Sequence, residues 1–370
     1  MTTQKGKRRL NTRARILLVV LAVLVVLGVA FFFRLQPKHQ VDSHVLPFSQ
    51  SDSYAFSENG VAYVKEQALY FDDLSRGKAN WRRDLQASGF RVSAGEHFIV
   101  VYSDHMAQAL DYENNMLTSA LKYNSKIMDV RCGENYFSIL RQDTEGNFEI
   151  SRITKNGEQL TPLTTDGYYV TDFGYYGNDQ LWMMSMDQAT NAPVTRINTF
   201  SDVDTKTGVM TIDDELVSEI FTSNQFLFAA GTSTLRAYTP TGKLEERSTI
   251  YGWQVLDYMP DKNANYFLLR SEASLHAPET TGQGRLLSLP TAGASVNIRY
   301  PADCVAAFLQ NGKIIMLSKD TAYIFGLDGN MQDSFPLGVE IGAALKVSKT
   351  RIMLISTEAE PRCYWMILGV

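Results

Sequence analysis

Short apolar segments recur along most of this chain, and their spacing restricts its fold more than any other feature. Eight runs of four to six residues follow turn signals, the first starting at residue 61 and the last at 352, so the seven intervals average about 41 residues. Their aromatic and branched side chains favour strands over helices. The runs are VAYV (61–64), HFIVVY (97–102), YFSIL (136–140), LWMMSM (181–186), FLFAA (226–230), YFLLR (266–270), IIMLS (314–318) and IMLIS (352–356).

This period is typical of a β-propeller, in which every repeat forms one blade. A single four-stranded sheet cannot cover both of its own faces, whereas blades packed around an axis cover each other. We therefore predict an all-β fold, an eight-bladed β-propeller of four-stranded antiparallel blades, with seven blades as the alternative count. Two consecutive β-sandwiches would also bury short strands, but they would not require a sustained period.

Several copies contain a third strand and a second turn after the apolar run. Examples are residues 69–72 followed by Gly77, Leu235–Tyr238 followed by Gly242, and Ala322–Phe325 followed by Gly329. In the fourth copy, Asp204 to Gly208 occupies the same place. A glycine at this point supplies the positive φ of a tight hairpin, so we expect turns between the third and fourth strands.

The last copy supplies only three strands, near Ala343–Val347, Ile352–Ser356 and Tyr364–Val370. The segment His44–Phe48 is left over before the first complete copy. We expect it to pair with the carboxy-terminal sheet as the missing fourth strand, because a ring closed in this way has no open edge.

The segment LYFDDLSRGKANWRRDL (69–85) resembles the repeat of PQQ-like, quinoprotein-type β-propellers, which include the BamB-like outer-membrane assembly propellers. The resemblance implies that Trp81 docks one blade on the next, although most later copies lack its counterpart. The whole layout also resembles uncharacterised anchored propeller proteins of Gram-positive bacteria, a group that implies no particular activity.

Residues 16–33 form an uninterrupted apolar run that predicts an amino-terminal transmembrane helix. Eighteen helical residues extend about 27 Å, close to the ~30 Å hydrocarbon core of a bilayer. Cleavage of a signal peptide after Ala30 is the alternative. The residues predicted to contact lipid are Ile16, Leu17, Leu18, Val19, Leu21, Leu24, Leu27, Phe31, Phe32 and Phe33.

Basic residues before this run predict its orientation. By the positive-inside rule, residues 1–15 form a cytoplasmic tail, 34–43 a tether, and 44–370 an extracytoplasmic propeller at the plasma membrane. The chain therefore crosses the membrane once. The orienting bases are Lys5, Lys7, Arg8, Arg9, Arg13 and Arg15.

Charge and cysteine content exclude several classes of protein. The formal net charge is −5, and residues 16–370 contain 29 of the 35 bases against all 40 acids, or −11. A large nucleic-acid-binding surface needs the opposite sign. Three cysteines are too few for a disulfide scaffold, and Cys304 and Cys363 are free thiols or one pair.

Catalytic motifs occur but lack the context that their chemistry needs. Ser119 and Lys122 match S-x-x-K, Tyr176 and Asn178 a Y-x-N variant, and Lys206–Gly208 K-T-G. That mechanism places its serine at the start of a buried helix, whereas Ser119 lies in a region of strands and turns. Asp202 and Asp204 begin like a calcium loop but lack its glycine, and the five histidines show no paired spacing. We predict no catalytic, cofactor-binding or metal-binding residues.

Two functions fit these observations. The first is a non-enzymatic protein-binding or scaffold module at the cell envelope, anchored in the bilayer by residues 16–33. The negative charge of its extracytoplasmic part favours basic partners. The second is a quinoprotein-type dehydrogenase or another small-ligand enzyme that uses the propeller funnel. It requires a cofactor set of Glu, Asn, Asp and Trp near the axis, which the sequence does not supply.

Overall fold

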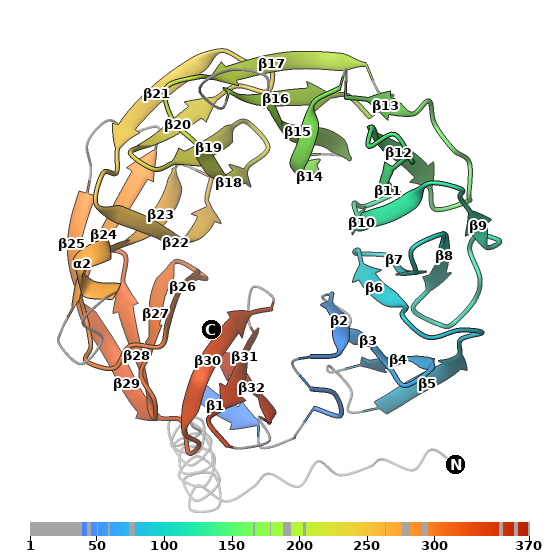
Figure 1. The fold of residues 1–370 in the computed structure, drawn as a ribbon. Helices are drawn as coiled ribbons and strands as arrows, with labels where there is room; N and C mark the ends of the chain where they lie inside the picture. Colours follow the sequence, from blue (N-terminus) through green and yellow to red (C-terminus); the bar gives the residue numbers. More distant parts are fainter. Residues whose placement is uncertain are drawn as a thin grey trace, which may run out of the picture.

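A computed structural model shows the chain as a ring of β-sheets (Figure 1). The described residues are 39–42, 46–49, 51–57, 60–73, 78–165, 167–177, 179–187, 194–202, 205–262, 264–275, 282–289, 295–347, 351–358 and 362–368.

Eight four-stranded antiparallel sheets surround one axis, which confirms the predicted count of eight. Blade 1 is β2 (Ser53–Phe56), β3 (Val61–Lys65), β4 (Ala68–Asp73) and β5 (Lys78–Asp84). Blade 2 is β6 (Arg91–Ala94), β7 (Phe98–Tyr102), β8 (Met106–Asp111) and β9 (Leu121–Lys122). Blade 3 is β10 (Lys126–Cys132), β11 (Tyr136–Gln142), β12 (Phe148–Thr154) and β13 (Leu163–Thr164). Blade 4 is β14 (Tyr169–Tyr176), β15 (Gln180–Asp187), β16 (Val194–Phe200) and β17 (Lys206–Ile212).

The second half of the ring repeats this plan. Blade 5 is β18 (Val217–Thr222), β19 (Leu227–Gly231), β20 (Thr234–Tyr238) and β21 (Leu244–Thr249). Blade 6 is β22 (Trp253–Pro260), β23 (Asn265–Ser271), β24 (Gly282–Leu289) and β25 (Ser295–Tyr300), with the short helix α2 (Glu272–Leu275) after β23. Blade 7 is β26 (Ala306–Gln310), β27 (Lys313–Leu317), β28 (Thr321–Gly326) and β29 (Met331–Pro336). Blade 8 is β30 (Ile341–Lys346), β31 (Arg351–Ser356), β32 (Cys363–Leu368) and β1 (His39–Asp42).

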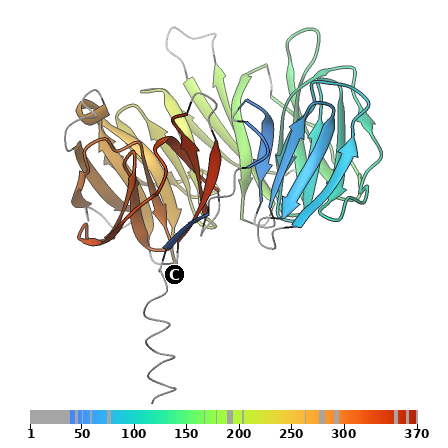
Figure 2. The same cartoon turned by 90° about the horizontal axis from the view of Figure 1, so that it is seen from below.

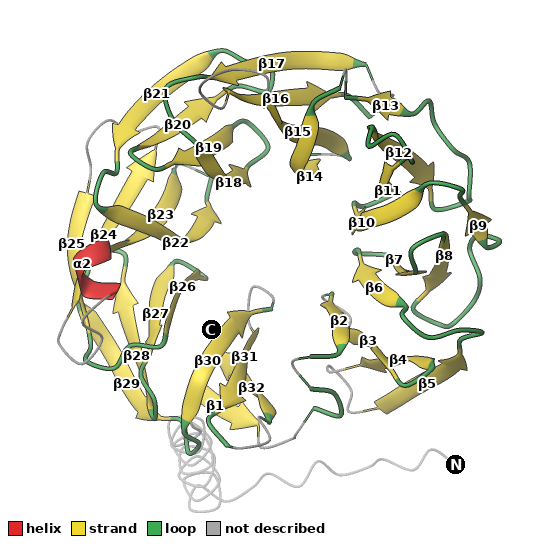
Figure 3. Ribbon diagram, in the orientation of Figure 1, coloured by secondary structure: helices red, strands yellow, loops and turns green. Residues whose placement is uncertain are grey.

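In blades 1 to 7 the strands follow each other in chain order, and the first strand of every blade lies nearest the axis (Figure 1). All eight predicted apolar runs coincide with the second strand of a blade. Strands dominate the described chain, as Figure 3 shows, and α2 is the one helix within the described ranges.

The second strands are apolar throughout because both of their faces are covered. In β7, Phe98 and Val100 pack against blade 3, whereas the alternate residues Ile99 and Val101 pack against blade 1. Successive strand side chains point to opposite faces, so a strand buried on both sides shows no polar alternation.

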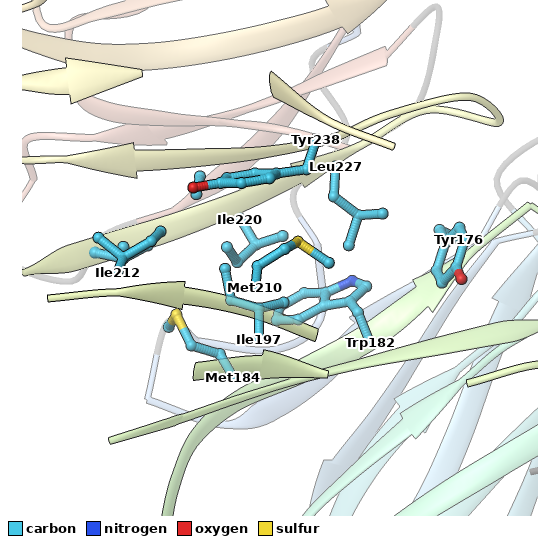
Figure 4. Packing of buried hydrophobic residues seen from close by; sticks show 11 residues of the cluster. Tyr176, Trp182, Met184, Ile197, Met210, Ile212, Ile220, Leu227 and Tyr238 are labelled. Carbon is cyan, nitrogen blue, oxygen red and sulfur yellow. The ribbon is translucent and has the colours of Figure 1, made fainter. Parts of the chain in front are cut away.

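Each boundary between neighbouring blades contains one hydrophobic cluster, so eight clusters join the eight blades into a ring. Figure 4 shows the cluster in which Trp182 and Ile197 of blade 4 meet Leu227 and Tyr238 of blade 5. Each fully buried side chain of this kind stabilises the fold by about 1.5–3 kcal/mol. These boundaries are the core of the protein.

The hairpins between third and fourth strands partly match the predictions. Gly242 follows β20 with φ +90° and Gly329 follows β28 with φ +80°, as expected. Gly208 instead lies inside β17, which corrects its placement in a turn. A Cβ at residue 208 would lie 2.5 Å from the Pro240 carbonyl oxygen, so glycine is needed where blade 4 approaches blade 5.

An amino-terminal strand closes the ring, but it is not the predicted one. β1 (His39–Asp42) pairs with β32, and Val41 packs into the cluster between blades 7 and 8. Among the described residues 46–49 there is no strand, so the pairing predicted for His44–Phe48 is wrong. Leu46 and Phe48 look like one face of a strand because both are buried, but they fill the boundary between blades 8 and 1.

The closing strand lies within residues 34–43, the predicted tether. The predicted cytoplasmic tail and membrane helix lie outside the described residues. Among the described residues, the helix is too short to cross a bilayer.

Replacing Val41 with proline tests the closure. Proline lacks a backbone donor and fixes φ, so V41P should disrupt the pairing of β1 with β32 and lower the melting temperature. V41A keeps the backbone and should cost less than V41P. Equal melting temperatures for V41P and V41A, measured by circular dichroism, would show that β1 does not close the ring.

Candidate functional site at the ring axis

Four consecutive blades each place one acidic residue on their innermost strand. These are Asp129 in β10, Asp172 in β14, Glu219 in β18 and Asp257 in β22, and we call them the axial acids. In each strand the ladder skips the residue directly before the acid. Such β-bulges bend a strand and redirect the following side chain. A β-bulge thus occupies the same position relative to the acid in all four strands.

Arg131 links the first two axial acids across the boundary between blades 3 and 4. Its Nε lies 3.1 Å from Asp129 Oδ2, and its Nη1 lies 2.7 Å from Asp172 Oδ1. The guanidinium also lies 5.0 Å from the centre of the Phe173 ring. All three side chains of this ion pair network are partly exposed, so solvent screens it.

Asp257 is held from two directions. Its Oδ2 accepts a 2.6 Å hydrogen bond from the Leu309 backbone N–H in blade 7. Lys346 Nζ, from blade 8, lies 2.8 Å from the same oxygen. Asp257 is thereby paired with a cation and connects blade 6 with two further blades.

Glu219 differs from its neighbours. Within the described part of the chain it has no hydrogen-bond or ion-pair partner. Glu219 is an exposed residue, but partial burial of its carboxyl raises its pKa, and the negative charges of Asp172 and Asp257 raise this pKa further. Two cations, Arg131 and Lys346, thus face four axial carboxylates, and Glu219 is the acid left without a counter-charge.

Glu219 also lines a groove of about 390 Å³ between blades 5 and 6, which we call the blade 5–6 groove. Its apolar wall is formed by Ile250, Trp253 and Val255, and Glu272 supplies a second carboxylate. Among the described residues, no lysine or arginine lines it. The remaining lining residues are Ser218, Ala230, Gly231, Thr232 and Gln254.

Exposed apolar side chains lie close to this groove in sequence. Tyr251, between lining residues Ile250 and Trp253, is 79% exposed, and Leu216, two residues before Ser218, is 44% exposed. These two side chains and the groove make this part of the surface a candidate contact site for another molecule.

The groove and the closing strand lie at opposite faces of the ring. His39 pairs with Leu368 at the end of blade 8 where β31 starts, and Figure 2 shows β1 in blue at this lower face. We call it the anchor face. β19 is the second strand of its blade, as β31 is of blade 8, so β19 ends at the face opposite to the one where β31 starts. Gly231 ends β19 and Thr232 follows it, so the groove opens on this opposite face, which we call the free face.

The catalytic motifs found in the sequence do not form one site. Ser119 lies in an exposed non-helical loop of blade 2, beside Lys122 in β9, whereas Tyr176 and Lys206 belong to blade 4. Asn178 and Asp204 lie outside the described residues. The described residues include no group of three or more His, Cys, Asp or Glu side chains able to hold a metal.

The cysteines and Trp81, which the sequence also singled out, form no catalytic or ligand-binding group among the described residues. Cys132 and Cys304 are free thiols, and burial raises the pKa of Cys304 to about 11. The side chain of Cys363 is not among the described side chains. Trp81 does reach the next blade, because its Nε1 donates a 2.9 Å hydrogen bond to the Tyr112 carbonyl. The predicted anchor and orienting residues all lie outside the described ranges.

The axial acids were not predicted from the sequence. Their signal is a single acid within an otherwise mostly apolar first strand, repeated after 43, 47 and 38 residues from Asp129 to Asp172, Glu219 and Asp257. Only a correct strand assignment distinguishes these acids from acids in turns.

Comparison of folds places this ring among known propellers. It is similar to BamB from Moraxella catarrhalis, with a TM-score of 0.55, 13% identity, and coverage of 88% of this chain and 96% of that one. It is also similar to the WD40 domain of SCAP from fission yeast, with a TM-score of 0.59, 10% identity, and coverage of 90% and 98%. At this identity the likeness shows the propeller fold alone. No curated protein matches the sequence.

A family model described as "Family of unknown function (DUF5711)" matches residues 39–360. The chain belongs to this family. The match starts at the first residue of β1, so the family model includes the closing strand.

Two amide substitutions of axial acids should change stability in opposite directions. The folded chain raises the pKa of Glu219 above its ordinary value of 4.5, so the charged carboxylate is less favourable folded than unfolded. E219Q should therefore raise the melting temperature at pH 7, and the difference should shrink as the pH falls toward 4.5.

D257N should lower stability by about 1–3 kcal/mol, because it weakens the contacts to Lys346 and Leu309.

Thermal melts between pH 4 and 8 provide the measurement. An E219Q variant that melts below the unmodified chain at pH 7 would show that the Glu219 carboxylate does have a stabilising counter-charge.

Proposed function

We propose that this member of the DUF5711 family is a membrane-anchored, extracytoplasmic propeller that acts as a non-enzymatic protein-binding scaffold at the cell envelope. The predicted membrane helix ends at residue 33 and β1 begins at His39. Five intervening residues extend at most about 18 Å. The anchor face would therefore lie next to the bilayer, with the free face turned away from it.

One observation carries the proposal: the free face combines exposed apolar side chains with an open acidic groove. Tyr251 and Leu216 are exposed beside this groove, on a rigid ring whose blades are joined by buried clusters. Propellers present loops on such a rigid frame, and loops usually carry recognition. The WD40 and BamB propellers share the fold, which supports this role without defining the partner.

Crosslinking in living cells tests the scaffold function. The full chain should capture specific envelope proteins, and a chain without residues 1–34 should lose them because it is neither exported nor anchored. L216D and Y251D on the free face should reduce capture several-fold. K262D, in the turn between β22 and β23 on the anchor face, is the matched control and should capture the same proteins.

Two results would contradict the proposal. One is identical capture by the L216D/Y251D variant and the unmodified chain. The other is a carboxy-terminal alkaline phosphatase fusion that is inactive, because this enzyme needs the oxidising environment outside the cytoplasm.

A further inference from the structure

The blade 5–6 groove has a chemistry that selects its occupant. Two carboxylates, Glu219 and Glu272, line it together with the apolar side chains of Ile250, Trp253 and Val255, and the described part of its lining contains no lysine or arginine. An anionic or purely apolar ligand would leave these carboxylates unpaired on binding, which costs free energy.

We propose that this groove binds a basic segment of a partner protein, with an arginine or lysine side chain inserted between its carboxylates and its tryptophan. The proposal rests on the scaffold function proposed above and specifies the chemistry of the partner. Arginine and lysine combine a charged end with an apolar stem, so they match a groove that has acidic and apolar walls. The face of a tryptophan ring also attracts cations.

Charge complementarity extends beyond the groove. Glu219 lies near enough to Asp172 and Asp257 for their negative charges to raise its pKa. Against the two cations Arg131 and Lys346, the four axial acids keep two negative charges in excess, and these draw a basic segment toward the axis. Pairing with a cation would supply the counter-charge that Glu219 lacks within the described chain.

The exposed flanks argue for a polypeptide rather than a small cation. Leu216, in the connection that enters blade 5, and Tyr251, in the connection that enters blade 6, are both exposed and lie within two residues of groove-lining residues in the sequence. A small cation would leave both side chains in water, whereas an extended segment with apolar residues beside its base would cover them.

Binding of a defined peptide to the full chain tests this inference. The chain is placed in phosphatidylcholine nanodiscs, and the probe is a fluorescein-labelled peptide with the sequence Arg-Leu-Arg-Leu-Arg. A matched peptide contains glutamine in place of arginine. Fluorescence anisotropy should show saturable binding of the arginine peptide, weakened by raising NaCl from about 50 to about 300 mM. The glutamine peptide should bind at least about tenfold more weakly.

Variants of the chain locate the binding. The E219Q/E272Q variant should weaken binding about tenfold, equivalent to about 1.4 kcal/mol, because it removes both carboxylates that would pair with the base. W253F should weaken it less, because a smaller aromatic ring remains. E340Q removes an exposed acid between blades 7 and 8 on the same face and should leave the affinity unchanged.

Three outcomes would overturn the inference: equal affinity for both peptides, equal weakening by E340Q and E219Q/E272Q, or no binding to the unmodified chain. None of these three outcomes would contradict the scaffold function if L216D and Y251D still reduced crosslinking in cells. Loss of that crosslinking effect together with retained peptide binding would instead refute the scaffold role.

Discussion

Burial of the second strand of each blade on both of its faces is the constraint on which this structure depends. In β7, for example, alternate side chains enter two different hydrophobic clusters, one with blade 1 and one with blade 3. A blade therefore completes its core only through both neighbours. Eight such blades cover all of their apolar faces only if the ring closes. The strand that completes blade 8 contributes to this core, because Val41 packs into the boundary between blades 7 and 8.

The closing strand also connects the fold to its location. Because β1 lies just after the predicted membrane helix, the segment that anchors the chain in our proposal is continuous with the segment that closes the ring. This arrangement assigns different surroundings to the two faces. The anchor face would lie close to the bilayer, and the groove that contains Glu219 and Trp253 opens away from it.

The fold class, the blade count and the second strands could be predicted from the sequence, because double-sided burial produces unbroken apolar runs. The closing strand was misplaced, since Leu46 and Phe48 are as apolar as a strand but fill a boundary between blades. Gly208 was assigned to a turn, although the glycine is needed for close approach to Pro240. The axial acids could not be grouped from sequence, because only the ring brings residues 129 to 257 around one axis.

Amide hydrogen exchange of β32 in the full chain tests closure most directly. If β1 (His39–Asp42) covers β32, the amides of β32 should exchange nearly as slowly as those of β31, since β31 and β32 would both be interior strands of one sheet. The amides of β32 that face β1 are the decisive ones. Exchange of these amides at the rate of an exposed edge strand, far faster than in β31, would contradict the closed ring.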